Sequence, residues 1–171
     1  MQQQDGMYTL IIKHPDGKID SEVIGAIIDF KLGFDTPKVV IDQMAHPDTK
    51  IVSLTITEGG YNFNPATGEF DFENKDVQHE LANPEEPKTI YGFLTAAIRK
   101  RKEKGLPAFT VMSCDNIQHN GDVAKEMLLT FANKQDEELA SYIEKEVSFP
   151  NSMVDRITPV TTQADICLLY T

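Results

Sequence analysis

Hydrophobic residues follow two alternating spacings along this chain, one typical of strands and one typical of helices. Short runs rich in β-branched and aromatic residues predict strands at 7–13, 23–32, 50–57 and 107–115. Apolar positions three or four residues apart predict helices at 36–45, 76–81, 88–104, 122–133 and 136–147. The alternation of strands with helices predicts an α/β fold built on a doubly wound, mostly parallel sheet.

The connections between these elements indicate how the strands pair. The sequence HPDG at 14–17 is typical of a tight turn, so the strand at 7–13 is predicted to form a hairpin with the run at 23–32. The run at 50–57 holds enough apolar residues to be buried on both faces, as parallel strands are. Residues 61–73 carry turn signals, and they fit either a small hairpin or an excursion over the sheet.

Polar residues stand where two of the predicted strands end. Glu58 follows the run at 50–57, and Asp115 and Asn116 close the run at 107–115. If these strands are parallel, both ends face one crevice at the carboxyl edge of the sheet, where open α/β sheets bind ligands. Structural roles are open for the same residues: Glu58 fits a loop carboxylate that accepts backbone N–H groups, and Asn116 fits a helix cap or an Asx-turn.

A third polar group lies in the last predicted segment. Asp155 and Arg156 stand inside an otherwise apolar run at 148–159, and an ion pair there has a purely structural interpretation. The four histidines lie in turns, in loops or on a polar helix face. From residue types and spacing we infer a crevice lined by acids and amides, and no particular reaction.

Composition narrows the class of protein. The chain has 171 residues, 40% of them hydrophobic, which is enough for one domain with a sizeable core. Its 27 Asp and Glu against 16 Lys and Arg give a net charge of -11, so the field of the whole chain repels nucleic acid and anionic membranes. The basic run at 99–102 falls in the last turns of a predicted helix, where cations complement the helix dipole.

The cysteines and the longest apolar runs bear on localisation. Cys114 and Cys167 lie far apart, without the spacing of a metal site, and no apolar segment opens the chain. No run approaches the roughly 18–20 apolar residues that span a bilayer. We therefore expect a reduced, cytoplasmic protein that has no metal and that binds neither nucleic acid nor membrane.

Three strings of the sequence resemble one enzyme family. TITEGGY at 55–61, PAFTVMSCDNIQHNG at 107–121 and FPNSMVDRITP at 149–159 are similar in order and separation to the polyol-specific long-chain dehydrogenases, the mannitol dehydrogenase family. The resemblance extends from about residue 5 to residue 162. It implies a Rossmann-like domain of an oxidoreductase that moves hydride between C2 of a polyol or sugar acid and the nicotinamide of NAD, without a catalytic metal.

The same resemblance implies roles for three residues. Asn116 matches an asparagine whose amide donates to the oxyanion that develops on the reacting oxygen. Glu58 matches a glutamate that helps to relay protons, and both residues are expected to contact the cofactor. Asp155 matches an aspartate near the catalytic lysine and the bound substrate or cofactor, where a carboxylate orients the lysine and tunes its pKa.

The sequence also departs from the family pattern. It contains no G-x-G-x-x-G turn to hold a cofactor pyrophosphate, and the family's lysine base, second asparagine and histidine belong to a C-terminal helical domain expected after residue 159. We therefore expect residues 1–162 to form a partial NAD-binding domain that lacks the first β-α unit, followed by an atypical tail at 163–171.

Two functions fit this expectation. The first is that of an inactive, truncated piece of a dehydrogenase that interconverts a polyol and a ketose, such as mannitol and fructose. The alternative is a non-catalytic binding or interaction module derived from that domain, which self-associates through uncovered sheet surface.

Overall fold

The computed structural model describes residues 4–64, 67–154 and 162–163. Asp155 and the expected tail beyond residue 163 therefore lie outside the described residues. The predicted helices and three of the four predicted strands are confirmed with ends shifted by a few residues, the strand predicted at 23–32 is misplaced, and one short helix was not predicted. In chain order the elements are β1 (Tyr8–Lys13), β2 (Ile19–Ile24), α1 (Pro37–Met44), β3 (Ile51–Leu54), α2 (Thr57–Gly60), α3 (Lys75–Ala82), α4 (Ile90–Glu103), β4 (Thr110–Ser113), α5 (Asn120–Gln135) and α6 (Glu137–Glu146).

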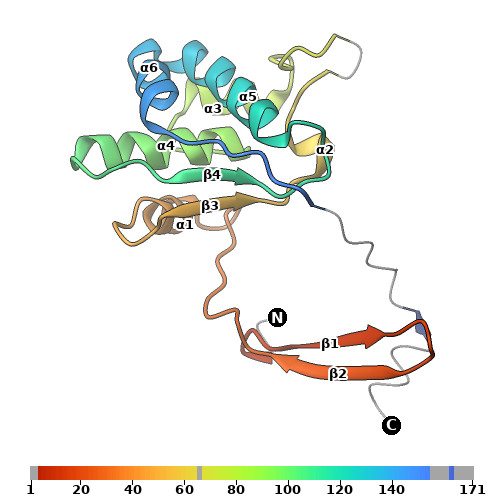
Figure 1. Cartoon of the computed structure of the whole chain (residues 1–171). Coiled ribbons are helices and arrows are strands. Elements are labelled where there is room, and N and C mark those ends of the chain that lie inside the picture. The colour runs from red at the N-terminus through yellow and green to blue at the C-terminus, as the bar shows by residue number, and fades with distance from the viewer. Residues whose placement is uncertain (1–3, 65–66, 155–161, 164–171) are drawn as a thin grey trace.

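β1 and β2 form an antiparallel hairpin that lies apart from the other elements (Figure 1). The turn is held by hydrogen bonds from His14 N to Lys18 O (2.8 Å) and from Gly17 N to His14 O (3.0 Å). The predicted hairpin is confirmed, but its second strand is Ile19–Ile24 and not 23–32. The tight turn reverses the chain at once, so pairing begins with the residue after Lys18.

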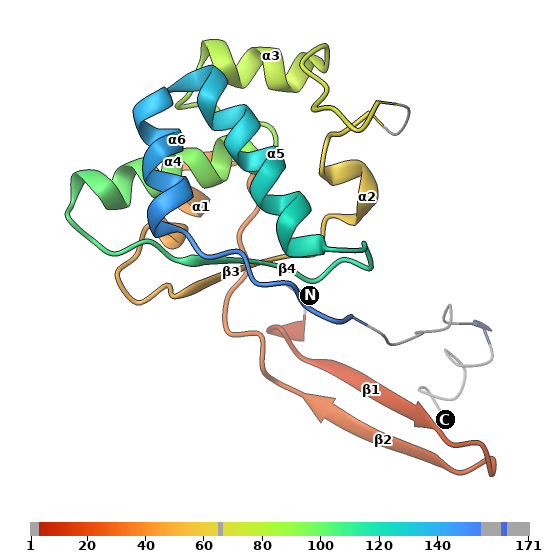
Figure 2. The ribbon, with the colours of Figure 1, turned by 45° about the horizontal axis from the view of Figure 1, so that its top comes forward.

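β3 and β4 are parallel neighbours, as predicted, with Leu54 opposite Ser113. Leu54 and Val111 are buried, whereas Ile51, on the other face of the pair, is 56% exposed. The prediction that this strand is buried on both faces is therefore wrong among the described residues. The reason is that the helices gather on one side of the strand pair (Figure 2).

The hydrophobic core lies between the covered face of β3 and β4 and the helices α4, α5 and α6. Residues 61–64 and 67–73 close one end of it, and an isolated antiparallel bridge between Phe63 and Phe70 favours the small hairpin, one of the two predicted alternatives. The Phe70 ring packs 5.2 Å from the Tyr91 ring, centroid to centroid. Among the described residues, no helix combines the length and apolar character needed to cross a membrane. Fully buried core side chains include Leu94, Ile98, Val111, Leu128, Phe131 and Ile143.

The start of α4 is held by a buried carboxylate on α3. Glu80 accepts hydrogen bonds from the N–H groups of Lys88 and Thr89, both at 2.8 Å, and these donors lie just before α4 begins. Burial raises the pKa of the Glu80 carboxyl above its usual value. Gly92 leaves the space that this carboxylate occupies, since a Cβ at that position would collide with it.

The end of α4 is held by Arg101, which is fully buried although it belongs to the basic run. Its Nε donates to Pro107 O (2.7 Å), and its Nη1 donates to His46 O (2.5 Å) and Thr49 O (3.1 Å). The guanidinium carbon also lies 5.6 Å from the centre of the Phe109 ring. These oxygens belong to the segments that precede β3 and β4, so Arg101 fastens the beginnings of both strands to α4.

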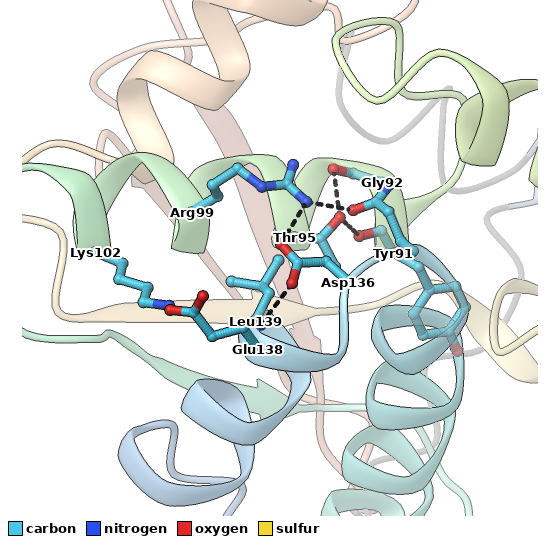
Figure 3. Close-up of polar contacts among 9 residues, drawn as sticks. Tyr91, Gly92, Thr95, Arg99, Lys102, Asp136, Glu138 and Leu139 are labelled. Atoms are coloured by element: carbon cyan, nitrogen blue, oxygen red, sulfur yellow. Dashed lines mark hydrogen bonds and ion pairs between the residues drawn. The ribbon is translucent and has the colours of Figure 1, made fainter.

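Figure 3 shows how α6 is held against α4. Asp136 is the N-cap residue of α6, and its Oδ1 accepts a hydrogen bond from Leu139 N (3.0 Å). Its Oδ2 lies 3.7 Å from Nη2 of Arg99 on α4. One turn further on, Lys102 Nζ lies 2.6 Å from Glu138 Oε1. Two residues of the basic run, Arg99 and Lys102, therefore pair with acids at the start of α6, besides lying at the C-terminal end of their own helix.

We predict that Arg101→Lys lowers the free energy of unfolding by about 2–4 kcal/mol, because one ammonium group cannot serve three oxygens that a planar guanidinium reaches together. Arg99→Lys is the matched control: it is the same change on the same helix, at a side chain that is 25% exposed, and we expect it to cost less than about 1 kcal/mol. Urea unfolding of both variants measures the difference. Equal losses would contradict the anchoring role of Arg101.

Candidate functional site

A pocket of about 440 Å³ opens at the carboxyl ends of β3 and β4. It is lined by two short segments, 57–59 and 115–117, one from the end of each strand. Glu58 and Asn116 are both exposed there. The prediction that these two strand ends face one crevice is therefore confirmed, while the roles of Glu58 and Asn116 stay predictions.

The segment that carries Glu58 has an unusual backbone. β3 ends at Leu54, and the chain turns into the single-turn helix α2 instead of continuing as the predicted strand. Thr57, the first residue of α2, has φ +60°. This left-handed conformation is rare for a β-branched residue and costs about 1–3 kcal/mol, so the surroundings must impose it.

The carboxylate of Asp115 accepts the backbone donors at this turn. Its Oδ1 accepts a hydrogen bond from Thr57 N (2.9 Å), and its Oδ2 accepts one from Ile56 N (3.1 Å). Asp115 is only 9% exposed although it lines the pocket. The end of β4 therefore supplies the acceptor for the backbone donors that follow β3.

Tyr61, which follows α2 directly, completes the arrangement. Its phenol donates to Asp115 Oδ2 (2.8 Å) and lies 2.5 Å from the hydroxyl of Ser113. Burial raises the pKa of Tyr61 well above its usual value, so the phenol keeps its proton and stays a donor. The Tyr61 side chain is fully buried, and its backbone carbonyl accepts a hydrogen bond from the Tyr91 hydroxyl (2.8 Å).

Asn120 attaches a third segment to the site. Its Nδ2 donates to Asp115 O (3.1 Å) and to Ser152 O (2.9 Å), and its Oδ1 accepts from Ser152 N (3.0 Å). The Ser152 hydroxyl also donates to Ser113 O. These hydrogen bonds hold the segment after α6 beside β4. Ser148 O, in the same segment, also accepts a hydrogen bond from Val111 N of β4 (3.0 Å).

Sequence reasoning assigned no role to Asp115, Tyr61 or Asn120. Asp115 was noted only as a polar residue at a strand end, and Tyr61 and Asn120 lay inside strings quoted for the family resemblance. The sequence signal for all three was their position within four residues of Glu58 or Asn116. Asp155, the third candidate residue, lies outside the described residues. In the described part of the chain, no group of three or more His, Cys, Asp and Glu side chains could hold a metal ion.

The parallel strand pair, its helix-covered face and the pocket at its carboxyl edge define a Rossmann-type α/β domain. A family model described as the mannitol dehydrogenase Rossmann domain matches residues 1–170. The chain belongs to the mannitol dehydrogenase family, which confirms the resemblance found in its three sequence strings.

Curated relatives are similar over nearly the whole chain. A polyol:NADP oxidoreductase from Gluconobacter oxydans is 49% identical over 163 residues, which are 95% of this chain and 33% of the relative. A mannitol 2-dehydrogenase from Aspergillus fumigatus is 49% identical over 164 residues, which are 95% of this chain and 32% of the relative. The chain thus spans about a third of the length of the curated relatives that it matches.

Solved structures of relatives have the same fold. The ternary complex of Pseudomonas fluorescens mannitol 2-dehydrogenase with NAD and D-mannitol is 47% identical, with a TM-score of 0.93 over 99% of this chain and 34% of that one. The substrate-free form of a D-sorbitol dehydrogenase is 46% identical, with a TM-score of 0.94 over 98% of this chain and 35% of that one.

We predict that Gly121→Ala detaches the segment after α6 from the site, because a Cβ at residue 121 would lie 2.5 Å from Pro150 O and 2.7 Å from Phe149 O. The hydrogen bonds between Asn120 and Ser152 would then break, and amide exchange at Ser152 should accelerate at least about tenfold. Hydrogen exchange followed by NMR measures this rate.

Gly25→Ala is the control for this variant, since a Cβ there meets one side-chain atom at the ordinary distance of 4.0 Å. It should leave the exchange rate of the Ser152 amide unchanged. The same rate in both variants would contradict the account of the close contact at Gly121.

Proposed function

We propose that this chain forms the nicotinamide- and substrate-facing wall of a polyol 2-dehydrogenase active site, in which hydride passes between C2 of a polyol and a nicotinamide ring. The observation that carries the proposal is the pocket that Glu58 and Asn116 share at the carboxyl edge of β3 and β4. It is supported by the similarity to a mannitol 2-dehydrogenase that binds NAD and D-mannitol. We favour mannitol and fructose as the substrate pair and NAD as the cofactor.

In this proposal Asn116 and Glu58 do different chemical work. Asn116 donates its side-chain amide to the reacting oxygen, where a neutral donor stabilises the growing negative charge. Glu58, exposed at the pocket, carries protons between the site and solvent. When bound, the nicotinamide accepts or returns the hydride. Asp155 is proposed to lie near the catalytic lysine of the family, and its role rests on the sequence resemblance alone.

The pocket suits one end of the dinucleotide. A Cβ on Gly59 would meet nothing within 4 Å, so the backbone of α2 is open to a planar ring. The lining includes two carboxylates, Glu58 and Asp115, which repel an anionic pyrophosphate. We therefore assign Glu58 and Asn116 to the nicotinamide end of the cofactor.

We also propose that different parts of the longer relatives supply cofactor binding and catalysis. Residues 1–162 act as part of an NAD-binding domain, and residues 163–171 form an atypical tail. Because the matched relatives are about three times as long as the region that they share with this chain, activity is proposed to need residues beyond that region. The lysine base of the family is the most important of them.

We predict that the purified 171-residue chain produces no polyol-dependent NADH and does not bind NAD tightly, because these residues contain no G-x-G-x-x-G turn and because the base is proposed to lie beyond the shared region. Absorbance at the NADH band, with mannitol, sorbitol and fructose tested separately, measures turnover. Polyol-dependent NADH formation by the chain alone would overturn the proposed need for further residues.

A chimera tests the proposed role of Asn116. In it this chain replaces the matching third of Pseudomonas fluorescens mannitol 2-dehydrogenase, and we expect the chimera to oxidise mannitol. Asn116→Ala in the chimera should lower kcat about 10²–10³-fold, the usual loss when one oxyanion donor is removed. Asn133→Ala, at an exposed position near the end of α5, is the matched control and should leave kcat unchanged. Equal kcat values for the two variants would refute the role of Asn116.

The alternative, a non-catalytic interaction module that self-associates, is favoured by one observation. Apolar side chains stay exposed on the open face of β3 and on the hairpin, including Ile51 (56%) and Val23 (66%). If this alternative is correct, size-exclusion chromatography should give a dimer or larger species that Ile51→Lys converts to a monomer.

A further inference from the structure

We propose that Asp115 is a positioning residue: its buried carboxylate sets the place of Glu58 relative to Asn116, and so gives the pocket its shape. The inference rests on the proposed function for the chemical roles of Glu58 and Asn116. The relative position of these two residues follows from hydrogen bonds alone. No role was assigned to Asp115 by the sequence pattern.

The side chain of Asp115 holds the segment that carries Glu58. Asp115 accepts the N–H groups of Ile56 and Thr57, which precede Glu58, and the phenol of Tyr61, which follows α2. One carboxylate therefore binds residues at both ends of the short helix α2. These three hydrogen bonds offset the energetic cost of the positive φ of Thr57, and all three are lost if the Asp115 carboxylate is removed.

The backbone of Asp115 also holds the position of Asn116, the next residue along the chain. The carbonyl oxygen of Asp115 accepts hydrogen bonds from Ile117 N (2.8 Å) and from Asn120 Nδ2 (3.1 Å). The backbone on both sides of Asn116 is thus fixed while its own side chain stays exposed in the pocket. Asp115 is bound to the Glu58 segment through its side chain and to the Asn116 turn through its backbone.

The hydrogen-bond donors around residue 115 explain why an aspartate stands there. The Asp115 side chain meets two backbone N–H donors and one phenol O–H donor, and a carboxylate, which only accepts, satisfies all three. An asparagine has one accepting oxygen, and in either orientation its NH₂ group faces a backbone N–H. Asp115→Asn therefore keeps the size of the side chain and leaves at least one of the two backbone N–H donors without its acceptor.

The test uses the 171-residue chain and needs no ligand. In Asp115→Asn we expect amide exchange at Ile56 and Thr57 to accelerate at least about tenfold, and the side-chain amide signals of Asn116 to shift in the ¹H–¹⁵N spectrum. Asp136→Asn is the matched control, because its carboxylate also accepts a backbone N–H at a helix start, on α6. It should leave the pocket signals in place, because Asn still accepts from Leu139 N at the start of α6.

A merely structural role for Asp115 gives a different result. Asp115→Asn would then lose stability while the Thr57 exchange rate and the Asn116 signals stayed as in the parent chain and in Asp136→Asn, and that outcome would overturn the proposal.

Tyr61→Phe covers the case in which Asp115→Asn does not fold. It keeps the buried ring and removes one of the three donors to Asp115. We expect exchange at Thr57 to rise about threefold and the Asn116 signals to move in the same direction as in Asp115→Asn. Unchanged signals in this variant would also overturn the proposal.

These readouts are independent of catalysis. If Asn116→Ala has no effect on kcat in the chimera, the proposed role of Asn116 fails and the exchange results still decide the role of Asp115. Conversely, an active chimera with unchanged exchange in Asp115→Asn would remove the positioning role alone.

Discussion

The carboxylate of Asp115 is the constraint on which the candidate site depends. It lies at the end of β4, yet its hydrogen-bond donors follow β3, 58 and 59 residues earlier in the chain. Parallel pairing brings the two strand ends together, but it does not determine how the chain leaves each strand. The direction after β3 is set by the hydrogen bonds from Ile56 N and Thr57 N to Asp115. Because of them the chain leaves β3 in a sharp turn, and this turn places Glu58 at the pocket.

The two ends of the strand pair are held in complementary ways. At the amino ends, the Arg101 guanidinium donates to main-chain oxygens of the preceding segments. At the carboxyl ends, a carboxylate accepts from main-chain N–H groups. A buried charge is costly unless polar groups surround it, and here backbone dipoles supply those groups. The strand pair is therefore fixed at both ends by charge-assisted hydrogen bonds, while hydrophobic packing covers one face between them.

Much of this fold follows from hydrophobic spacing. The helices, the parallel pair and the crevice shared by Glu58 and Asn116 were predicted because a periodic apolar pattern is a local property of the sequence. The missed features depend on distant contacts. Arg101 looked like one of several solvated cations at a helix end, and α2 looked like the end of a strand, because the partners of both are remote in sequence. The exposure of Ile51 likewise depends on which face of β3 the helices cover, and spacing alone does not specify that.

The central claim, that Asp115 joins the two strand ends, is tested most directly by scalar coupling across its hydrogen bonds. A long-range HNCO experiment on the uniformly labelled chain should give a correlation from the Thr57 amide nitrogen to the Asp115 carboxyl carbon, at the 2.9 Å separation of Thr57 N and Oδ1. The helical amides of α4 and α5 provide internal references for the coupling. Clear correlations in those helices with none between Thr57 and Asp115 would contradict the account.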